Sequence, residues 1–470
     1  MESYRFKCLK IVFRLLLCFV LLAITSGAQT VQTICPFNST NGANPYAGLT
    51  LGNDGYFYGT TSRGGSSGCG TVFKMTTNGT LTRLVSFNGS NGAYPDAALK
   101  LGNDGNFYGT TSQGGITNYA FGPEGTVFKV TTNGTLTTLI FFNSNNGDGT
   151  HPQAGLTLGS DGNFYGTTLQ GGSNGYGTVF IVTTNGTLTT LVSFNSSGGT
   201  GPRAALTLGP NGKFYGTTWG GGSGGGGGDG TIFQLTSNGT LTTLVSFSGT
   251  NGAHPYAALT LGTDGNFYGT TADGGSDYAG TVFQFTTNGT LTTLVSFKNT
   301  NGANPNASLT LGSDGNFYGT TSGGGSSGCG TVFIVTTNGT LTTLVSFDYY
   351  NGAFPFAALT LGSDCNLYGT TYYGGITNST YPSGMGTVFR LLLPPVVRPT
   401  LTLQFWSGYP LLSVYGSLGD TYTIEYTTNL VVPNWTPILI VPNLSISPFQ
   451  MIDPAGIGQS ARFYRAVQSQ

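Results

Sequence analysis

One five-residue phrase, Phe-Tyr-Gly-Thr-Thr, recurs along this chain of 470 residues. It begins at Phe57, Phe107, Phe164, Phe214, Phe267 and Phe317, and a variant with leucine in first place begins at Leu367. Successive copies start 50, 57, 50, 53, 50 and 50 residues apart. A unit of this length cannot bury its apolar faces alone, so tandem copies predict stacked units that share one continuous core.

Each repeat divides into four short runs of β-branched, aromatic and leucine residues. In the fifth repeat these runs are Ala257–Leu261, Asn266–Thr271, Gly280–Phe285 and Leu291–Phe297. The first two are separated by Asp264-Gly265 and the last two by Asn288-Gly289, which are turn signals typical of β-hairpins. We therefore expect four antiparallel strands in each repeat, numbered first to fourth below.

Four strands in each of seven repeats predict an all-β fold, a seven-bladed β-propeller. The seventh repeat has no fourth strand, since its third run leads directly into Leu393-Pro394-Pro395. The segment 31–37 precedes the first repeat and aligns with the fourth strand of that repeat, Leu81–Phe87. It is therefore a spare strand at the start of the chain. Pairing this segment with the last repeat closes the ring and removes an exposed sheet edge.

The ends of the chain differ from the repeats. Residues 1–28 combine basic residues, an apolar run at Leu15–Ile24 and small residues before Gln29, a pattern typical of a secretory signal peptide. We expect the propeller over 29–392, a Pro-rich linker over 393–399, and a small β-sandwich domain over 400–470. Strand-like runs in that tail are Leu401–Trp406, Tyr422–Tyr426, Ile438–Val441 and Arg462–Val467.

The composition argues against several classes of partner. Charged residues make up 7% of the chain and the net charge is −1, so the positive surface that nucleic acid requires is not expected. After removal of the signal peptide, no stretch is long and apolar enough to span a membrane. Four of the six cysteines lie beyond the signal peptide, and their positions in distant repeats predict mostly free thiols.

The repeated phrases identify a family resemblance. The run 312–321, Gly-Ser-Asp-Gly-Asn-Phe-Tyr-Gly-Thr-Thr, is followed by Gly-Gly, Gly-Thr-Val-Phe and Leu-Thr-Thr-Leu-Val-Ser-Phe. This pattern over 31–392 resembles the Gloeo/Verruco (GloVer) tandem-repeat family of secreted bacterial proteins. The tail resembles a C-terminal β-domain of exported proteins from the same bacterial group, through Tyr422–Asn429, Pro433–Thr436 and Phe463–Arg465. The resemblance implies secretion and carries over no catalytic residue.

Variation among the repeats is concentrated on one rim. The turns between first and second strands, and between third and fourth strands, are nearly constant. The opposite rim, formed by the loops from second to third strand and from fourth strand to the next repeat, varies in length and chemistry. Its candidate ligand-binding residues are Tyr46, Arg63, Tyr94, Asp96, His151, Arg203, Trp219, His254, Tyr256, Asp273, Phe356, Tyr372 and Tyr373. Aromatic faces beside amides and charges suit sugars or peptides, although unconstrained loops also vary in this way.

Catalytic and metal sites lack a sequence signal. The two histidines, His151 and His254, each precede a proline and have no nucleophile motif beside them. The recurring turn aspartates, of which Asp264 is an example, are explained by the hairpin turn, and Asn211 replaces one of them. We therefore expect no catalytic residue, no metal site and no cofactor.

These observations predict a secreted or cell-surface bacterial repeat protein that is not an enzyme. It is expected to bind an extracellular glycan or protein through the variable rim. One alternative is a polysaccharide-active enzyme, a lyase or a hydrolase, that uses Asp96, Arg203, Asp273 or Glu124 on the same rim. Another is a structural surface protein that only self-associates. All three stay open at this point, as does the oligomeric state.

Overall fold

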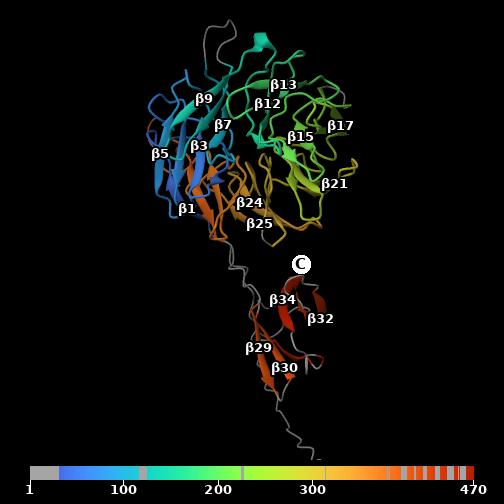
Figure 1. The fold of residues 1–470 in the computed structure, drawn as a ribbon. Coiled ribbons are helices and arrows are strands. Elements are labelled where there is room, and N and C mark those ends of the chain that lie inside the picture. Colours follow the sequence, from blue (N-terminus) through green and yellow to red (C-terminus); the bar gives the residue numbers. More distant parts are fainter. Residues whose placement is uncertain are drawn as a thin grey trace, which may run out of the picture.

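The computed structural model describes residues 31–115, 124–223, 227–312, 314–377, 379, 382–392, 400–406, 409–415, 421–428, 435–441, 449–453, 455 and 462–469. The predicted signal peptide and the predicted linker at 393–399 lie outside these residues. Within them the fold is all-β apart from short 3₁₀ turns, of which η1 (Ser144–Asn146) is one, and no helix is long and apolar enough to cross a membrane. Figure 1 shows the strands of the repeats gathered around a common centre.

Within the described residues, the repeats form seven antiparallel sheets of four strands each. Their strands are β2 (Thr50–Leu51), β3 (Phe57–Thr61), β4 (Thr71–Met75) and β5 (Leu81–Ser86); β6 (Lys100–Leu101), β7 (Phe107–Thr111), β8 (Thr126–Val130) and β9 (Leu136–Phe141); β10 (Thr157–Leu158), β11 (Phe164–Thr168), β12 (Thr178–Val182) and β13 (Leu188–Ser193); β14 (Thr207–Leu208), β15 (Phe214–Thr218), β16 (Thr231–Leu235) and β17 (Leu241–Ser246); β18 (Thr260–Leu261), β19 (Phe267–Thr271), β20 (Thr281–Phe285) and β21 (Leu291–Ser296); β22 (Thr310–Leu311), β23 (Phe317–Thr321), β24 (Thr331–Val335) and β25 (Leu341–Ser346); and β26 (Thr360–Leu361), β27 (Leu367–Thr371) and β28 (Thr387–Leu391) with β1 (Val31–Pro36). This arrangement is consistent with a β-propeller.

The first strand of each repeat is shorter than the sequence predicts. In the fifth repeat only Thr260–Leu261 pairs with β19, whereas Ala257–Leu261 was expected. The carbonyl oxygens of Ala257 and Leu259 instead accept hydrogen bonds from threonine hydroxyls of the preceding repeat, at 3.2 and 2.6 Å. This segment therefore bonds to the neighbouring sheet as well as to its own.

The closing strand pairs as predicted. β1 runs antiparallel to β28, with Thr33 opposite Phe389 and Cys35 opposite Val388, so the blue β1 lies beside the orange strands of the last repeat (Figure 1). The register shifts between Thr33 and Cys35, as it does between third and fourth strands elsewhere in the ring. Segment 31–36 therefore reproduces a fourth strand, including its bulge. Pro36 lies on this outermost strand, where a missing N–H donor is tolerated.

The recurrent phrase packs neighbouring sheets together, because both faces of each second strand are buried. Its tyrosine packs on the phenylalanine of the next repeat: the ring centroids of Tyr58 and Phe107 are 4.0 Å apart, and those of Tyr368 and Phe57 are 4.4 Å apart. The second contact joins the last repeat to the first. Each buried cluster of the ring accordingly contains residues of two adjacent repeats.

The two threonines of the phrase have different partners. The first donates to a carbonyl oxygen of the next repeat in all seven copies, from Thr60 to Ala97 at 3.1 Å through to Thr370 to Ala47 at 3.1 Å. The second forms a buried 2.8 Å hydrogen bond with the threonine that opens the third strand, as in Thr61 with Thr71. One hydroxyl thus joins sheets, and the other joins strands within a sheet.

The described residues of the C-terminal region form two three-stranded sheets. Their orders are β29-β30-β33 and β32-β31-β34, with β29 (Thr400–Trp406), β30 (Tyr409–Tyr415), β31 (Thr421–Thr427), β32 (Thr436–Val441), β33 (Phe449–Ile452) and β34 (Phe463–Ser469). One buried cluster contains Leu412 of the first sheet together with Ile424 and Val441 of the second. The sequence predicted β29, β31, β32 and β34 but missed β30 and β33, where Pro410 and the short run at 449–452 obscured the strand pattern.

Candidate functional site

One residue from each repeat lines the central hollow of the ring just before the first strand. The seven residues are Tyr46, Asp96, Gln153, Arg203, Tyr256, Asn306 and Phe356. Small residues two positions further on line the same cavity of about 270 Å³, named here the inner cavity: Gly48, Ala98, Gly155, Ala205, Ala258, Ser308 and Ala358. All seven repeats therefore surround one space, and small side chains leave it open.

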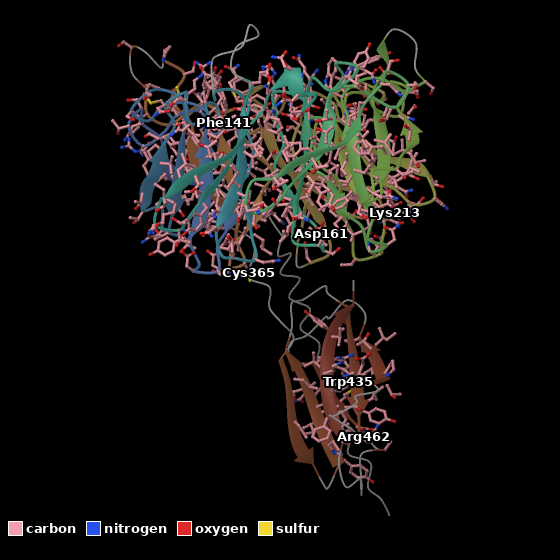
Figure 2. The ribbon with its side chains drawn as sticks, turned by 45° about the horizontal axis from the view of Figure 1, so that its top comes forward. Phe141, Asp161, Lys213, Cys365, Trp435 and Arg462 are labelled. Atoms are coloured by element: carbon pink, nitrogen blue, oxygen red, sulfur yellow. The ribbon has the colours of Figure 1, made fainter. Side chains whose placement is uncertain are left out.

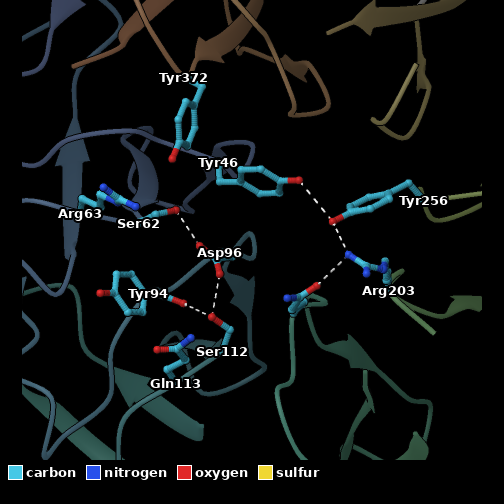
Figure 3. A pocket seen from close by; sticks show the side chains of 11 residues that line it. Tyr46, Ser62, Arg63, Tyr94, Asp96, Ser112, Gln113, Arg203, Tyr256 and Tyr372 are labelled. Atoms are coloured by element: carbon cyan, nitrogen blue, oxygen red, sulfur yellow. Dashed lines mark hydrogen bonds between the residues drawn. The ribbon is translucent and has the colours of Figure 1, made fainter. Parts of the chain in front are cut away.

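A second cavity of about 470 Å³, named here the outer cavity, opens on the variable rim. Its lining is Tyr46, Ser62, Arg63, Tyr94, Asp96, Ser112, Gln113, Gln153, Arg203, Tyr256 and Tyr372 (Figure 3). Five of these residues also line the inner cavity, so they separate the two spaces. The opposite rim carries the constant turns, three of which are marked in Figure 2 by Asp161, Lys213 and Cys365.

A chain of hydrogen bonds crosses the mouth of the ring. Tyr46 Oη donates to Tyr256 Oη at 3.4 Å, although their repeats, the first and the fifth, are not neighbours. Arg203 Nη1 donates to Tyr256 Oη at 2.8 Å and to Gln153 Oε1 at 3.4 Å. A hydroxyl pair at 3.4 Å is long compared with the usual O–H···O distance of about 2.7–2.8 Å. This bridge is therefore weak.

Asp96 is the acidic residue of the outer cavity. Ser62 Oγ donates to Asp96 Oδ1 at 2.6 Å, and Ser112 Oγ lies 2.7 Å from Oδ2 and 3.1 Å from the Tyr94 carbonyl oxygen. Ser112 has one hydroxyl proton for these two acceptors. A protonated Asp96 resolves the conflict, because it donates to Ser112 Oγ while Ser112 donates to Tyr94. In agreement, burial raises the pKa of Asp96, and it outweighs the lowering by both serines and by Arg63.

Aromatic side chains form one wall of the mouth. Tyr46 stacks on Phe356 with ring centroids 4.9 Å apart, and Tyr372 meets both rings edge-on at 6.1 and 5.6 Å. Burial raises the pKa of Tyr46 and of Tyr372, so both phenols stay neutral and keep their hydroxyl donors. Tyr373 packs on Tyr372 at 4.8 Å and lies outside the cavity lining.

The backbone is strained in each loop that leads from one repeat to the next. The residue before the proline of each loop has a positive φ in all seven repeats: Asn44 53°, Tyr94 56°, His151 58°, Gly201 60°, His254 55°, Asn304 53° and Phe354 54°. Only the fourth repeat uses glycine there. For the other residues this left-handed conformation costs roughly 1–2 kcal/mol each. Of these residues, Tyr94 lines the outer cavity.

Three predicted residues form a separate cluster beside the cavity. The His254 ring stacks on Trp219 with centroids 4.5 Å apart, and its Nδ1 lies 3.1 Å from Asp273 Oδ2. The guanidinium of Arg203 lies 5.5 Å from the Trp219 ring, so this cluster reaches the cavity through Arg203. His151 is not part of it: its Nδ1 lies 3.0 Å from Thr150 Oγ1, and burial lowers its pKa while Glu124 opposes the shift.

The structure thus brings many of the predicted residues together. The outer cavity includes Tyr46, Arg63, Tyr94, Asp96, Arg203, Tyr256 and Tyr372, whereas Phe356 lines only the inner cavity. Sequence reasoning missed Ser62 and Ser112 as site residues; it placed Gln113 and Gln153 on the variable rim but did not count them among the ligand-binding candidates. The two serines could have been found from the sequence, because only the first, second and sixth repeats have serine directly after the Thr-Thr pair. Glu124 is buried and accepts hydrogen bonds from Ser144, away from the cavity lining.

The turn aspartates have a structural role, as predicted. Asp264 Oδ1 accepts from the backbone N–H of Asn266 at 3.1 Å, and its Oδ2 accepts from the Tyr268 hydroxyl at 2.9 Å. The tyrosine contact was not foreseen. Across the ranges described by the structure, no group of three or more His, Cys, Asp or Glu residues is placed to hold a metal ion, and Cys35, Cys69, Cys329 and Cys365 are unpaired.

Solved structures with a related arrangement include several enzymes. An ulvan lyase of polysaccharide lyase family PL25 is 10% identical, with a TM-score of 0.48, over 77% of this chain and 96% of that chain. A putative 6-phosphogluconolactonase from Bacteroides uniformis is 15% identical, with a TM-score of 0.44, over 86% and 99%. A gluconolactonase from Xanthomonas campestris is 11% identical, with a TM-score of 0.40, over 78% and 91%.

These comparisons correct the expectation that the chain is not an enzyme, because a lyase and lactonases are among the similar structures. At such identities no activity is transferred from them. None of the curated proteins matches the chain. The family profile described as Gloeobacter/Verrucomicrobia repeat matches residues 20–228, 101–261 and 222–407, and thus nearly the whole ring. The chain therefore belongs to the Gloeobacter/Verrucomicrobia repeat family.

Proposed function

We propose that this protein binds a saccharide in the outer cavity. The observation that carries the proposal is the lining, which combines four tyrosines with two glutamines, two serines and two arginines. Tyrosine rings offer flat apolar surfaces to the C–H faces of a sugar, and amides and hydroxyls match its hydroxyl groups in both donor and acceptor roles. No single one of these residues is diagnostic, but their convergence on one concave site is typical of small-molecule recognition.

The size of the cavity favours a sugar over a protein ligand. Its volume of about 470 Å³ lies within the roughly 300–1,000 Å³ that is usual for ligand pockets. A stable protein interface instead buries about 800 Å² per partner over a broad surface. A protein ligand would therefore have to insert a loop or a terminus into the cavity.

We extend the proposal to the architecture and location of the chain. The seven sheets are the blades of one closed propeller, residues 400–470 form a β-sandwich, and residues 1–28 direct export to the outside or the surface of the cell. Support for the ring comes from the pairing of β1 with β28 and from an inner cavity lined by all seven repeats. Support for the sandwich comes from the buried cluster that the two C-terminal sheets share.

The test is retention on a glycan array that includes bacterial, plant and algal polysaccharides, using the chain without residues 1–28. The double variant Tyr94→Ala, Gln113→Ala is expected to bind at least about tenfold more weakly, a loss of about 1.4 kcal/mol. Tyr56→Ala is the matched control, because this tyrosine lies in a constant turn on the opposite rim. Absence of retention on every glycan, or equal loss in the control, contradicts the proposal.

A second candidate is a polysaccharide-active enzyme that uses the same cavity. It is favoured by the Asp96 site, where the hydrogen bonds and the raised pKa both suit a protonated carboxyl, the form required of a general acid. Asp96→Asn should then abolish turnover of a bound polysaccharide while leaving its retention within a few-fold of wild type. Turnover that persists in this variant removes Asp96 from the chemistry.

A further inference from the structure

We infer that the saccharide bound in the outer cavity is acidic, with carboxylate groups held by Arg63 on one side of the cavity and by Arg203 on the other (Figure 3); this inference rests on the saccharide site proposed above. It goes beyond that proposal because it specifies the chemical class of the sugar. The argument depends on the balance of charge in the cavity, on the hydrogen bonds that Arg203 leaves unused, and on the position of Arg63.

Positive charge exceeds negative charge in the cavity. Two guanidinium groups line it, against the single carboxyl group of Asp96. This is notable in a chain with only 16 Lys and Arg among 470 residues. Both oxygens of Asp96 are engaged by serine hydroxyls, and among the described residues no carboxylate forms an ion pair with either arginine.

Arg203 is held in place by neutral groups. Its Nη1 donates to Tyr256 Oη at 2.8 Å and to Gln153 Oε1 at 3.4 Å, and its guanidinium lies 5.0 Å from the centroid of the Tyr256 ring. Within the described residues its Nε is buried without a partner, and no hydrogen bond is formed by Nη2. A buried unpaired donor costs roughly 1–3 kcal/mol. The side chain is thus fixed in position with its charge unpaired, as an anion-binding arginine requires.

Arg63 provides the second cation from another repeat. Its side chain is exposed on the cavity wall, and its charge acts on Asp96 and on Tyr372, lowering the pKa of each against the effect of burial. Arg63 follows β3 in the first repeat and Arg203 precedes β14 in the fourth, so the two approach the cavity from different parts of the ring. A planar guanidinium matches the two oxygens of a carboxylate, and an acidic sugar can present them while its ring contacts the tyrosines.

The experiment compares matched ligands by calorimetric titration of the full mature chain. The probes are oligomers of galacturonic, glucuronic and mannuronic acid, the carboxyl-reduced form of each, and a sulfated neutral oligomer. At least one uronate is expected to bind tenfold or more tightly than its reduced form, with affinity that falls as salt is added. Arg63→Gln with Arg203→Gln should abolish this preference, and Lys213→Gln on the opposite rim should not change it.

The outcomes separate the inference from the proposed function. Equal binding of a uronate and its reduced form overturns the inference but leaves the saccharide site intact. Tighter binding of the sulfated oligomer than of every uronate overturns the choice of carboxylate. If none of the probes and no array glycan binds, the proposed function fails as well. Arg203→Lys keeps the positive charge but loses the planar guanidinium group. Its preference for a uronate over the reduced form is expected to lie between those of wild type and of the double Gln variant. Its melting temperature should stay close to wild type, which shows that the variant is folded.

Discussion

The residue before each rim proline combines a strained backbone with a position on the variable rim. Gly201 takes its positive φ without cost, whereas Tyr94, His254 and Phe354 take the same conformation with large side chains. The left-handed conformation therefore lowers the free energy of unfolding in those repeats but not in the fourth. Strained backbone that persists in this way is typical of ligand-binding positions. Tyr94 fits this explanation best, because it lines the outer cavity.

Replacing Tyr94 with glycine is expected to stabilise the ring and weaken ligand binding. Relief of the left-handed strain contributes about 1–2 kcal/mol, and the greater freedom of glycine in the unfolded chain removes about half of it. The measurement is urea unfolding together with glycan retention. Cys365→Gly is the control: this cysteine has a φ of 63° in a turn on the opposite rim, so the variant should gain stability without any change in retention.

Asp96 predicts a distinct pH dependence of stability. Its folded-state pKa lies above the ordinary value of 3.8, mainly because of burial, so its contribution to the free energy of unfolding is greatest below that value. The contribution is lost as pH rises through the raised folded pKa. Asp96→Asn lacks this titration, so its stability relative to wild type should increase from acidic to neutral pH in urea unfolding. A difference that does not vary with pH refutes the explanation.

At the scale of the element, the Phe-Tyr-Gly-Thr-Thr phrase forms the second strand of each repeat. Each of its five residues has a different contact. Phenylalanine and tyrosine face opposite neighbouring sheets, and the two threonines bond to the next sheet and to the third strand. The glycine between them leaves room for a phenylalanine of the third strand. At Gly269, an added Cβ would lie 2.5 Å from Phe283 Cζ and 3.0 Å from Leu259 Cδ2. Its φ is ordinary, so space rather than backbone conformation requires glycine there.

Gly269→Ala is accordingly expected to destabilise the protein by about 1–3 kcal/mol, the usual cost of overpacking a core. Phe283→Leu removes the ring atom that the new methyl group meets. In a double-mutant cycle measured by chemical unfolding, the two changes together should cost clearly less than the sum of the single changes. Additive losses would mean that the glycine is required for another reason.

At the scale of the whole molecule, closure depends on a strand more than 350 positions away from its partner. Val31 pairs with Leu391, and Thr360 Oγ1 donates to the Leu49 carbonyl at 2.6 Å, repeating the contact made at other seams of the ring. Without β1, the outer edge of β28 would be exposed to pairing with other chains. The stability of the ring is therefore expected to depend on its first residues more than on its last domain.

Deletion of residues 29–40 is expected to lower the melting temperature much more than deletion of residues 400–470, and to promote aggregation through the free edge of β28. Differential scanning calorimetry of the two truncated proteins and of the chain without residues 1–28 checks the order. Light scattering during the same scans checks the aggregation. An equal or smaller loss on removing 29–40 would show that the pairing of β1 contributes little.

The sequence by itself determined the repeat, the four strands of each sheet, the closing segment and the variable rim, because hairpin turns and alternating side chains are local signals. Only the tertiary structure decided which rim residues meet. Tyr46 and Tyr256 are far apart in sequence, and their contact follows from the radius of the ring. The sharing of Asp96 between Ser62 and Ser112 depends on the fit of adjacent repeats. The carbonyl groups just before β18 likewise bond across a seam that no single repeat contains.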